Sequence, residues 1–136
     1  MKHQVLRIEQ MIKLKELRID VIPRGNCLMY TSDSLGNYYL KYGESTCVDD
    51  IRAFSLQDII DLLPTKIELK NESGPYRLEI SAYAGIIDYT FCSYTFKKTT
   101  YDQENNKNGI LNAAYEMLVF LFENRSKWGT YRRFKL

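Results

Sequence analysis

A strict alternation of apolar and polar residues at 76–84, YRLEISAYA, constrains the fold more than any other feature of the chain. Successive side chains of a β-strand point to opposite faces of the sheet, so this alternation predicts a strand with one buried face. Ala84 and Gly85 then predict a tight turn. Residues 86–96 are rich in β-branched and aromatic side chains and predict the second strand of a hairpin. Helical structure at 76–96 would contradict this interpretation.

Another hairpin is predicted at 27–43, CLMYTSDSLGNYYLKYG. Strand-forming residues flank the segment Asp33-Ser34-Leu35-Gly36, which begins with Asp and ends with Gly, as type I turns prefer. The second strand has tyrosines at even and odd positions, so they lie on both of its faces. They are Tyr38, Tyr39 and Tyr42.

The segment RAFSLQDIIDLLPTKIEL, 52–69, places two carboxylates one helical turn apart. Ser55 is a good helix N-cap, and Asp58 falls three residues later, where it completes a capping box. Asp61 lies away from the apolar stripe and faces water, and Pro64 ends the helix. The stripe is Leu56, Ile59, Ile60 and Leu63. We therefore interpret the two carboxylates as parts of a helix and not as an acid/base pair.

Two further helices are predicted, at 4–18 and at roughly 109–124. The first consists of helix formers with a broad apolar stripe and ends ahead of Pro23. The second is the most apolar element, because a second apolar stripe lies beside its first. This second stripe is Tyr115, Val119 and Phe122. Apolar surface around more than half of a helix indicates either a core helix or one that partly contacts a partner.

Together these patterns predict an α+β fold with the order α-β-β-α-β-β-α. The two hairpins are expected to form a mainly antiparallel sheet covered by the first and last helices. A chain of 136 residues fits one domain, which we place at 1–124. Residues 125–136 are predicted to be a C-terminal tail.

The chain has few residues in patterns that are typical of catalytic or cofactor-binding sites. His3, the only histidine, lies near the N-terminal end, so a nucleophilic pair would need this residue as its base. The seven glycines are isolated, so no phosphate-binding loop is predicted. We interpret Asp49-Asp50 as a solvated turn and not as a magnesium site. The protein is therefore predicted not to be an enzyme and to have no catalytic, metal-binding or cofactor-binding residues.

The sequence also predicts a cytoplasmic protein. The longest apolar run, 117–122, is far shorter than the roughly 20 residues that a membrane span needs. No apolar signal segment follows the N-terminal lysine and arginine. The cysteines are odd in number and widely spaced, which favours reduced structural thiols over disulfides or a zinc site. They are Cys27, Cys47 and Cys92.

The C-terminal tail, NRSKWGTYRRFKL from Asn124, combines basic and aromatic residues. Residues 125–136 carry five basic and no acidic side chains, whereas residues 26–96 carry five basic and ten acidic ones. Such a pattern suits contacts with phosphate and stacking on bases, and it also suits docking of the tail on the acidic body. The candidate partner-binding residues are Arg125, Lys127, Trp128, Tyr131, Arg132, Arg133, Phe134 and Lys135.

Three segments together resemble a family of small uncharacterised proteins from prophages and mobile elements of anaerobic bacteria. They are EQMIKLKELRID at 9–20, AFSLQDIIDLLPTKI at 53–67 and LNAAYEMLVFLFEN at 111–124. The matching residues are helix caps and core positions, so the resemblance implies a fold and a genetic setting and no mechanism. This chain departs from the family in its tail, because the family tends to end soon after the last helix.

Two functions are compatible with these observations. The first is a phage or mobile-element protein that binds and modulates a host protein or ribonucleoprotein, for example an inhibitor of a CRISPR-type defence nuclease. The alternative is an accessory protein that binds nucleic acid through the basic-aromatic tail. In either case we expect the tail, together with the exposed stripe of the last helix, to form the functional surface.

Overall fold

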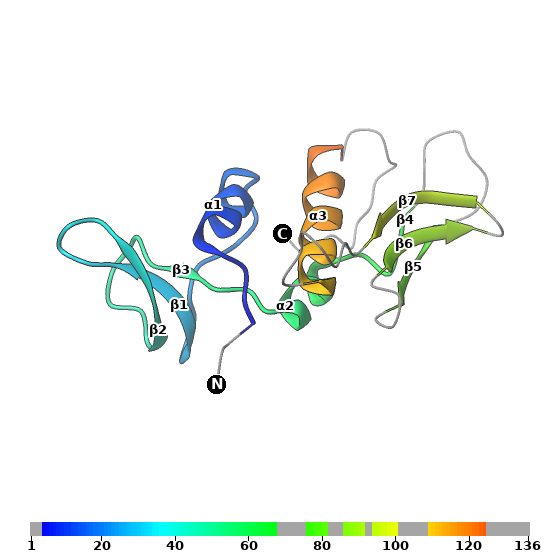
Figure 1. The fold of residues 1–136 in the computed structure, drawn as a ribbon. Coiled ribbons are helices and arrows are strands. Elements are labelled where there is room, and N and C mark those ends of the chain that lie inside the picture. Colours follow the sequence, from blue (N-terminus) through cyan, green and yellow to red (C-terminus); the bar gives the residue numbers. More distant parts are fainter. Residues whose placement is uncertain (1–3, 68–75, 82–85, 92–93, 101–108, 125–136) are drawn as a thin grey trace. The chain divides into compact units, whose positions relative to one another are not determined.

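The computed structural model describes residues 4–67, 76–81, 86–91, 94–100 and 109–124 of the chain. They confirm the α+β class, with helices and antiparallel sheets in roughly the predicted order. The described residues form two compact units that meet in the sequence between Ser55 and Leu56. Each unit has its own sheet (Figure 1). The prediction placed both hairpins in one sheet over 1–124.

The first unit contains helix α1 (Ile8–Glu16) and the strands β1 (Cys27–Ser32), β2 (Tyr38–Gly43) and β3 (Ile51–Arg52). The strand order is β2-β1-β3, and both pairings are antiparallel. The short strand β3 takes the side of β1 that faces away from β2. Both sides of β1 are therefore paired within the first unit.

Helix α1 is shorter than the predicted span of 4–18. Residues before it are extended, and the Leu6 N–H donates to the Phe54 carbonyl at 2.9 Å. The helix begins at Ile8, where the Gln10 side-chain oxygen accepts a hydrogen bond from the Arg7 backbone N–H at 3.0 Å. It ends well before Pro23, because Arg18 adopts a left-handed conformation with φ 66°.

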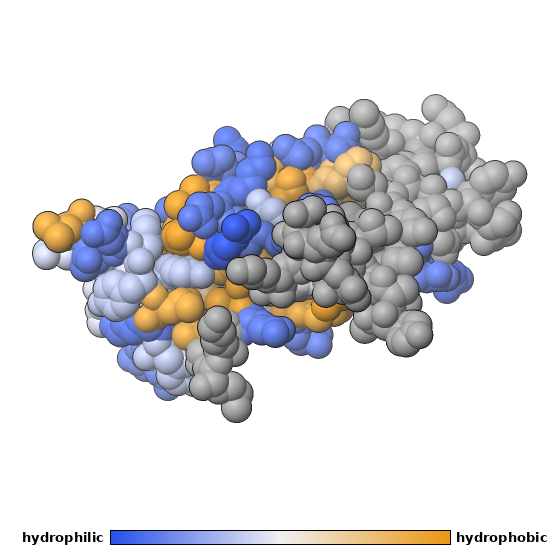
Figure 2. All heavy atoms as spheres, viewed as in Figure 1, coloured by the Kyte–Doolittle hydropathy of each residue, from blue (hydrophilic) through white to orange (hydrophobic). Residues whose placement is uncertain are grey.

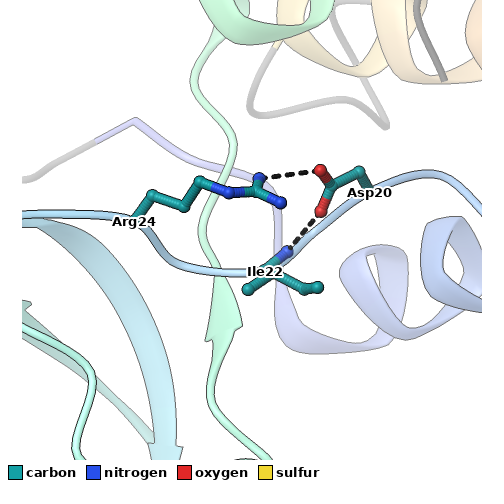
Figure 3. Close-up of polar contacts among 3 residues, drawn as sticks. All are labelled: Asp20, Ile22 and Arg24. Atoms are coloured by element: carbon teal, nitrogen blue, oxygen red, sulfur yellow. Dashed lines mark hydrogen bonds and ion pairs between the residues drawn. The ribbon is translucent and has the colours of Figure 1, made fainter.

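A short polar cluster shapes the connection between α1 and β1 (Figure 3). One carboxylate oxygen of Asp20 accepts the Ile22 N–H at 3.1 Å, and the other pairs with Arg24 at 2.7 Å. The hydrogen bond from Ile22 and the Arg24 guanidinium hold the pKa of Asp20 below its ordinary value of 3.8. The same connection lies along β3, since the Arg52 N–H donates to the Val21 carbonyl at 2.8 Å.

The predicted turn at Asp33–Gly36, between β1 and β2, is confirmed. The Gly36 N–H donates to the Asp33 carbonyl at 3.0 Å, and Gly36 has φ 85°, which a side chain would oppose. The Asp33 carboxylate accepts the N–H groups of Leu35 and Asn37, each at 2.9 Å. The Asp33 N–H donates to the Asn37 carbonyl at 2.9 Å and closes the strand ladder.

The second unit contains α2 (Leu56–Leu62), β4 (Lys66–Ile67), β5 (Tyr76–Ser81), β6 (Ile86–Phe91), β7 (Tyr94–Thr100) and α3 (Ile110–Glu123). The strands follow one another as an antiparallel sheet in the order β4-β5-β6-β7, so the predicted strand is confirmed over Tyr76–Ser81, and residues 82–84 lie outside the described residues. The expected buried face is wrong, because Tyr76 and Leu78 are half-buried and Ile80 is 39% exposed. The single strand predicted at 86–96 is instead divided between β6 and β7.

Helix α3 is the centre of the core of this unit. It contacts β6, β7 and α2, and most of its apolar side chains are buried. Among its larger side chains, Met117, Leu118 and Leu121 are fully covered, and Ile59, Ile67 and Ile87 are equally covered on other elements of the unit. Burial of these side chains is the main source of stability that the unit has.

We expect Tyr30→Phe to destabilise the first unit by about 1 to 2 kcal/mol. The Tyr30 hydroxyl is buried and donates to the Leu6 carbonyl at 2.6 Å, so its loss leaves a covered carbonyl without a donor. Urea unfolding of the two proteins measures the change. Tyr42→Phe is the matched control, because Tyr42 is 70% exposed. An equal loss in both variants would contradict the importance of the Tyr30 contact.

Candidate interaction surface

The predicted contact residues of the tail, from Arg125 to Lys135, lie outside the described residues. The stripe of Tyr115, Val119 and Phe122 on α3, the other part of the expected surface, is largely covered. Phe122 is only 3% exposed, and Tyr115 and Val119 are half-buried. The physical reason is that α3 contacts both its sheet and α2, so most of its circumference is covered. Of the two alternatives for this helix, the structure supports the core helix.

The two carboxylates of the 52–69 segment lie on α2. Asp61 is exposed and accepts a hydrogen bond from the Gln57 amide at 2.8 Å, one helical turn away. The helix begins directly after Ser55, as predicted, and both Ser55 and Asp58 have interaction partners. Within the described ranges, no cluster of three or more metal-ligating side chains occurs, and no helix is long and apolar enough to cross a membrane.

The turn at Asp49-Asp50 is solvated only in part. Asp49 is exposed, but Asp50 is 6% exposed, so the predicted solvated turn is wrong for Asp50. Its carboxylate lies inside the loop that follows β2. One oxygen accepts the Ser45 hydroxyl at 2.9 Å and the N–H groups of Thr46 and Cys47, both at 3.2 Å. These donors replace water at Oδ2, whereas the other oxygen, Oδ1, is buried and accepts no hydrogen bond.

Hydrogen bonding also sets the charge state of this group. Burial raises the pKa of the Asp50 carboxyl, but the hydrogen bonds that it accepts outweigh burial and hold the pKa below the ordinary 3.8. Thr31 contributes to this lowering, together with the bonds from Ser45, Cys47 and Thr46. Asp50 is therefore an ionised anchor of the loop. Sequence reasoning missed this role because an Asp-Asp pair gives no sign of which carboxylate turns inward.

The cysteines differ in their surroundings. Cys27 is half-buried and Cys47 is exposed, and both thiols are free. Cys92 lies outside the described residues. The exposure of Cys47 differs from the predicted structural role of the thiols, because the loop held by Asp50 turns this side chain outward.

Strand β2 carries the most exposed apolar surface of the first unit. All three of its tyrosines and Leu40 are exposed, and so is Leu35 in the preceding turn, at 84%. Figure 2 shows apolar atoms at the tip of this hairpin, at the far left of the view. We call the exposed apolar and aromatic residues of the strand itself, Tyr38, Tyr39, Leu40 and Tyr42, the β2 edge surface.

The backbone of β2 is also open on the side away from β1. In an antiparallel ladder, hydrogen-bonded and non-hydrogen-bonded pairs alternate. The bond between Asp33 and Asn37 marks a hydrogen-bonded pair, and every second residue along β2 from there also bonds to β1. These residues are 39, 41 and 43. The N–H and C=O groups of Tyr38, Leu40 and Tyr42 therefore point outward. An independent bond supports this phase, since Leu28, opposite Tyr42, offers its carbonyl to Ala53 and not to β2.

Strand β2 differs from the other sheet edges among the described residues. Proteins protect exposed edges with short strands, lysines or bulges. Strands β3 and β4 have two residues each, and β7 has two lysines and a register irregularity in its pairing with β6. Strand β2 has six residues in unbroken register and one charge, Lys41, which is half-buried on the face opposite Tyr38, Leu40 and Tyr42. It is the one long, weakly protected edge in this part of the chain.

Known proteins provide no guide to this surface. Comparison of the chain with protein-family models, curated proteins and solved structures finds no match.

Replacement Asp50→Asn should destabilise the first unit by about 1 to 3 kcal/mol at neutral pH, because the amide weakens the bonds that the carboxylate accepts. The folded-state pKa is lowered, so this contribution is complete above pH 3.8 and is lost as the pH falls through the folded-state pKa. Urea midpoints of both proteins at pH 7 and near pH 3 should therefore differ less in acid. A difference that does not depend on pH would contradict the ionised anchor.

Proposed function

We propose that this protein is a non-catalytic binding protein whose β2 strand pairs with an extended segment of a partner protein. The observation that carries the proposal is the long edge of β2, which lacks the protection found at the other described edges. Selection against aggregation removes such edges from soluble proteins unless something covers them. Strand addition to an open edge is a common mode of peptide recognition.

In this arrangement the backbone of β2 would provide affinity for the added strand, and its side chains would provide specificity. The outward N–H and C=O groups of residues 38, 40 and 42 supply main-chain hydrogen bonds to an added strand. The side chains of Tyr38, Leu40 and Tyr42 share one face, where they can pack against alternate residues of that strand. Tyrosine suits such a surface because it is large, stiff and amphipathic, and it is enriched in binding hot spots.

The composition of β2 favours a protein partner over nucleic acid. Lys41 is its only cation, whereas binding to a phosphate backbone needs several. Binding of nucleic acid therefore depends on the basic-aromatic tail, and it remains the alternative proposal. The resemblance to proteins of prophages and mobile elements supports a host protein as the partner, and a CRISPR-type defence nuclease is one candidate.

We expect Leu40→Pro to abolish capture of the partner while the fold survives. Proline removes the outward N–H of residue 40 and leaves the β1–β2 bonds intact, and such edge positions tolerate proline. The measurement is capture by the tagged, dilute chain from a lysate of the bacterium that carries the gene. Ser34→Pro is the matched control, because it places proline at the second turn position, which proline favours.

The neighbouring position sharpens this experiment. Lys41→Pro removes an N–H that bonds to β1, so it should lower the stability of the hairpin, whereas Leu40→Pro should not. Retention of the same partner by a folded Leu40→Pro chain would refute strand addition at β2. Capture that instead disappears on deletion of residues 126–136 would place the contact in the tail.

A further inference from the structure

We infer that, in the free protein, β2 pairs with β2 of a second copy of this chain, antiparallel, about a twofold axis at Leu40. The inference uses the same edge as the proposed function and names what covers that edge before a partner arrives. It joins two three-stranded sheets into one continuous sheet. Three features carry it: the phase of the outward hydrogen bonds, the position of the only charge, and the protection of the outer edges.

The backbone restricts the possible registers. Outward N–H and C=O groups belong to residues 38, 40 and 42, so an antiparallel partner must bring its own outward residues opposite them. A twofold axis that passes through a residue satisfies this condition. An axis between two residues would place outward groups opposite inward ones and leave the ladder unbonded. Only axes through Tyr39, Leu40 or Lys41 keep most of the strand paired.

Charge and length then select one of the three axes. An axis at Lys41 would place the two lysines directly opposite each other, which is unfavourable. An axis at Tyr39 would pair Tyr42 with Gly36 in the turn of the second copy, so the ladder would be shorter. An axis at Leu40 pairs Leu40 with Leu40, Tyr38 with Tyr42 and Tyr39 with Lys41 of the second copy. Each of these pairs is apolar, aromatic or cation-aromatic.

Such a dimer closes on itself. Pairing about a twofold axis uses the same surface on both copies, so neither β2 remains free. The outer edges of the joined sheet are the two β3 strands, each of two residues, and the Arg52 N–H of β3 is already bonded to Val21. Further strands therefore have no comparable edge to join. The dimer protects the free protein from open-ended aggregation, and it must dissociate before a partner segment can bind.

Substitution of Leu40 by opposite charges tests the position of the axis. Sedimentation equilibrium of the natural chain should give twice the 16.0 kDa chain mass, falling toward that mass on dilution. Leu40→Lys and Leu40→Glu should each remain monomeric, because each would place like charges opposite each other. An equimolar mixture of the two should recover the dimer mass, since lysine then faces glutamate. Leu35→Lys, in the turn, is the control and should leave the dimer unchanged.

A cross-link provides a second measurement that does not depend on charge. The Cα atoms of a hydrogen-bonded antiparallel pair lie about 5.5 Å apart, which is within the range that a disulfide spans. Mild oxidation of Leu40→Cys should link two copies through residue 40, as identified by mass spectrometry. Leu35→Cys, oxidised in the same way, should give no link through residue 35.

The outcomes separate this inference from the proposed function. A natural chain that is monomeric at every concentration, or a dimer that survives in both charged variants, would overturn the dimer. Absence of the link through residue 40 would also overturn it. None of these results affects capture of a partner by the dilute chain. Conversely, a dimer with the expected cross-link and no partner sensitive to Leu40→Pro would refute the proposed function alone.

Discussion

The phase of the hydrogen-bond ladder between β1 and β2 determines most of what the first unit can do. It is set at the turn, where the Asp33 carboxylate holds two N–H groups and the Asp33 N–H closes the ladder on Asn37. From this point, alternate residues of β1 bond to β2 and to β3, so both sides of β1 are occupied. Alternate residues of β2 bond to β1 or face outward. A change of phase by one residue would turn Tyr39 and Lys41 outward in place of Tyr38, Leu40 and Tyr42.

The features that surround this ladder restrict access to one side. The bond between Val21 and Arg52 covers β3, and the Tyr30 hydroxyl ties the extended N-terminal residues to β1. The buried carboxylate of Asp50 shapes the loop that leaves β2. Each of these contacts satisfies polar groups that would otherwise lose water on burial. The outer edge of β2 has no comparable contact among the described residues, and this difference is the physical basis of both proposals.

Sequence reasoning located the elements whose signals are local. The strand at 76–81, the turn at Asp33 and the helix start after Ser55 depend on neighbouring residues, and the structure confirms all three. It did not locate β3 and β4, because strands of two residues have no pattern of their own. The tyrosines on both faces of β2 were visible in the sequence, but their exposure depends on the order of strands. Burial of Asp50 depends in the same way on the path of a loop, which no short motif specifies.

Amide hydrogen exchange along β2, followed by NMR in a dilute sample, tests the central claim most directly. The open edge predicts an alternating pattern, in which the N–H groups of residues 39, 41 and 43 are protected and those of Tyr38, Leu40 and Tyr42 exchange rapidly. When the sample is concentrated, the N–H groups of Tyr38, Leu40 and Tyr42 should also become protected, because the dimer forms. Strong protection of Tyr38, Leu40 and Tyr42 at every dilution would mean that another part of the same chain already covers the edge, and it would contradict the account.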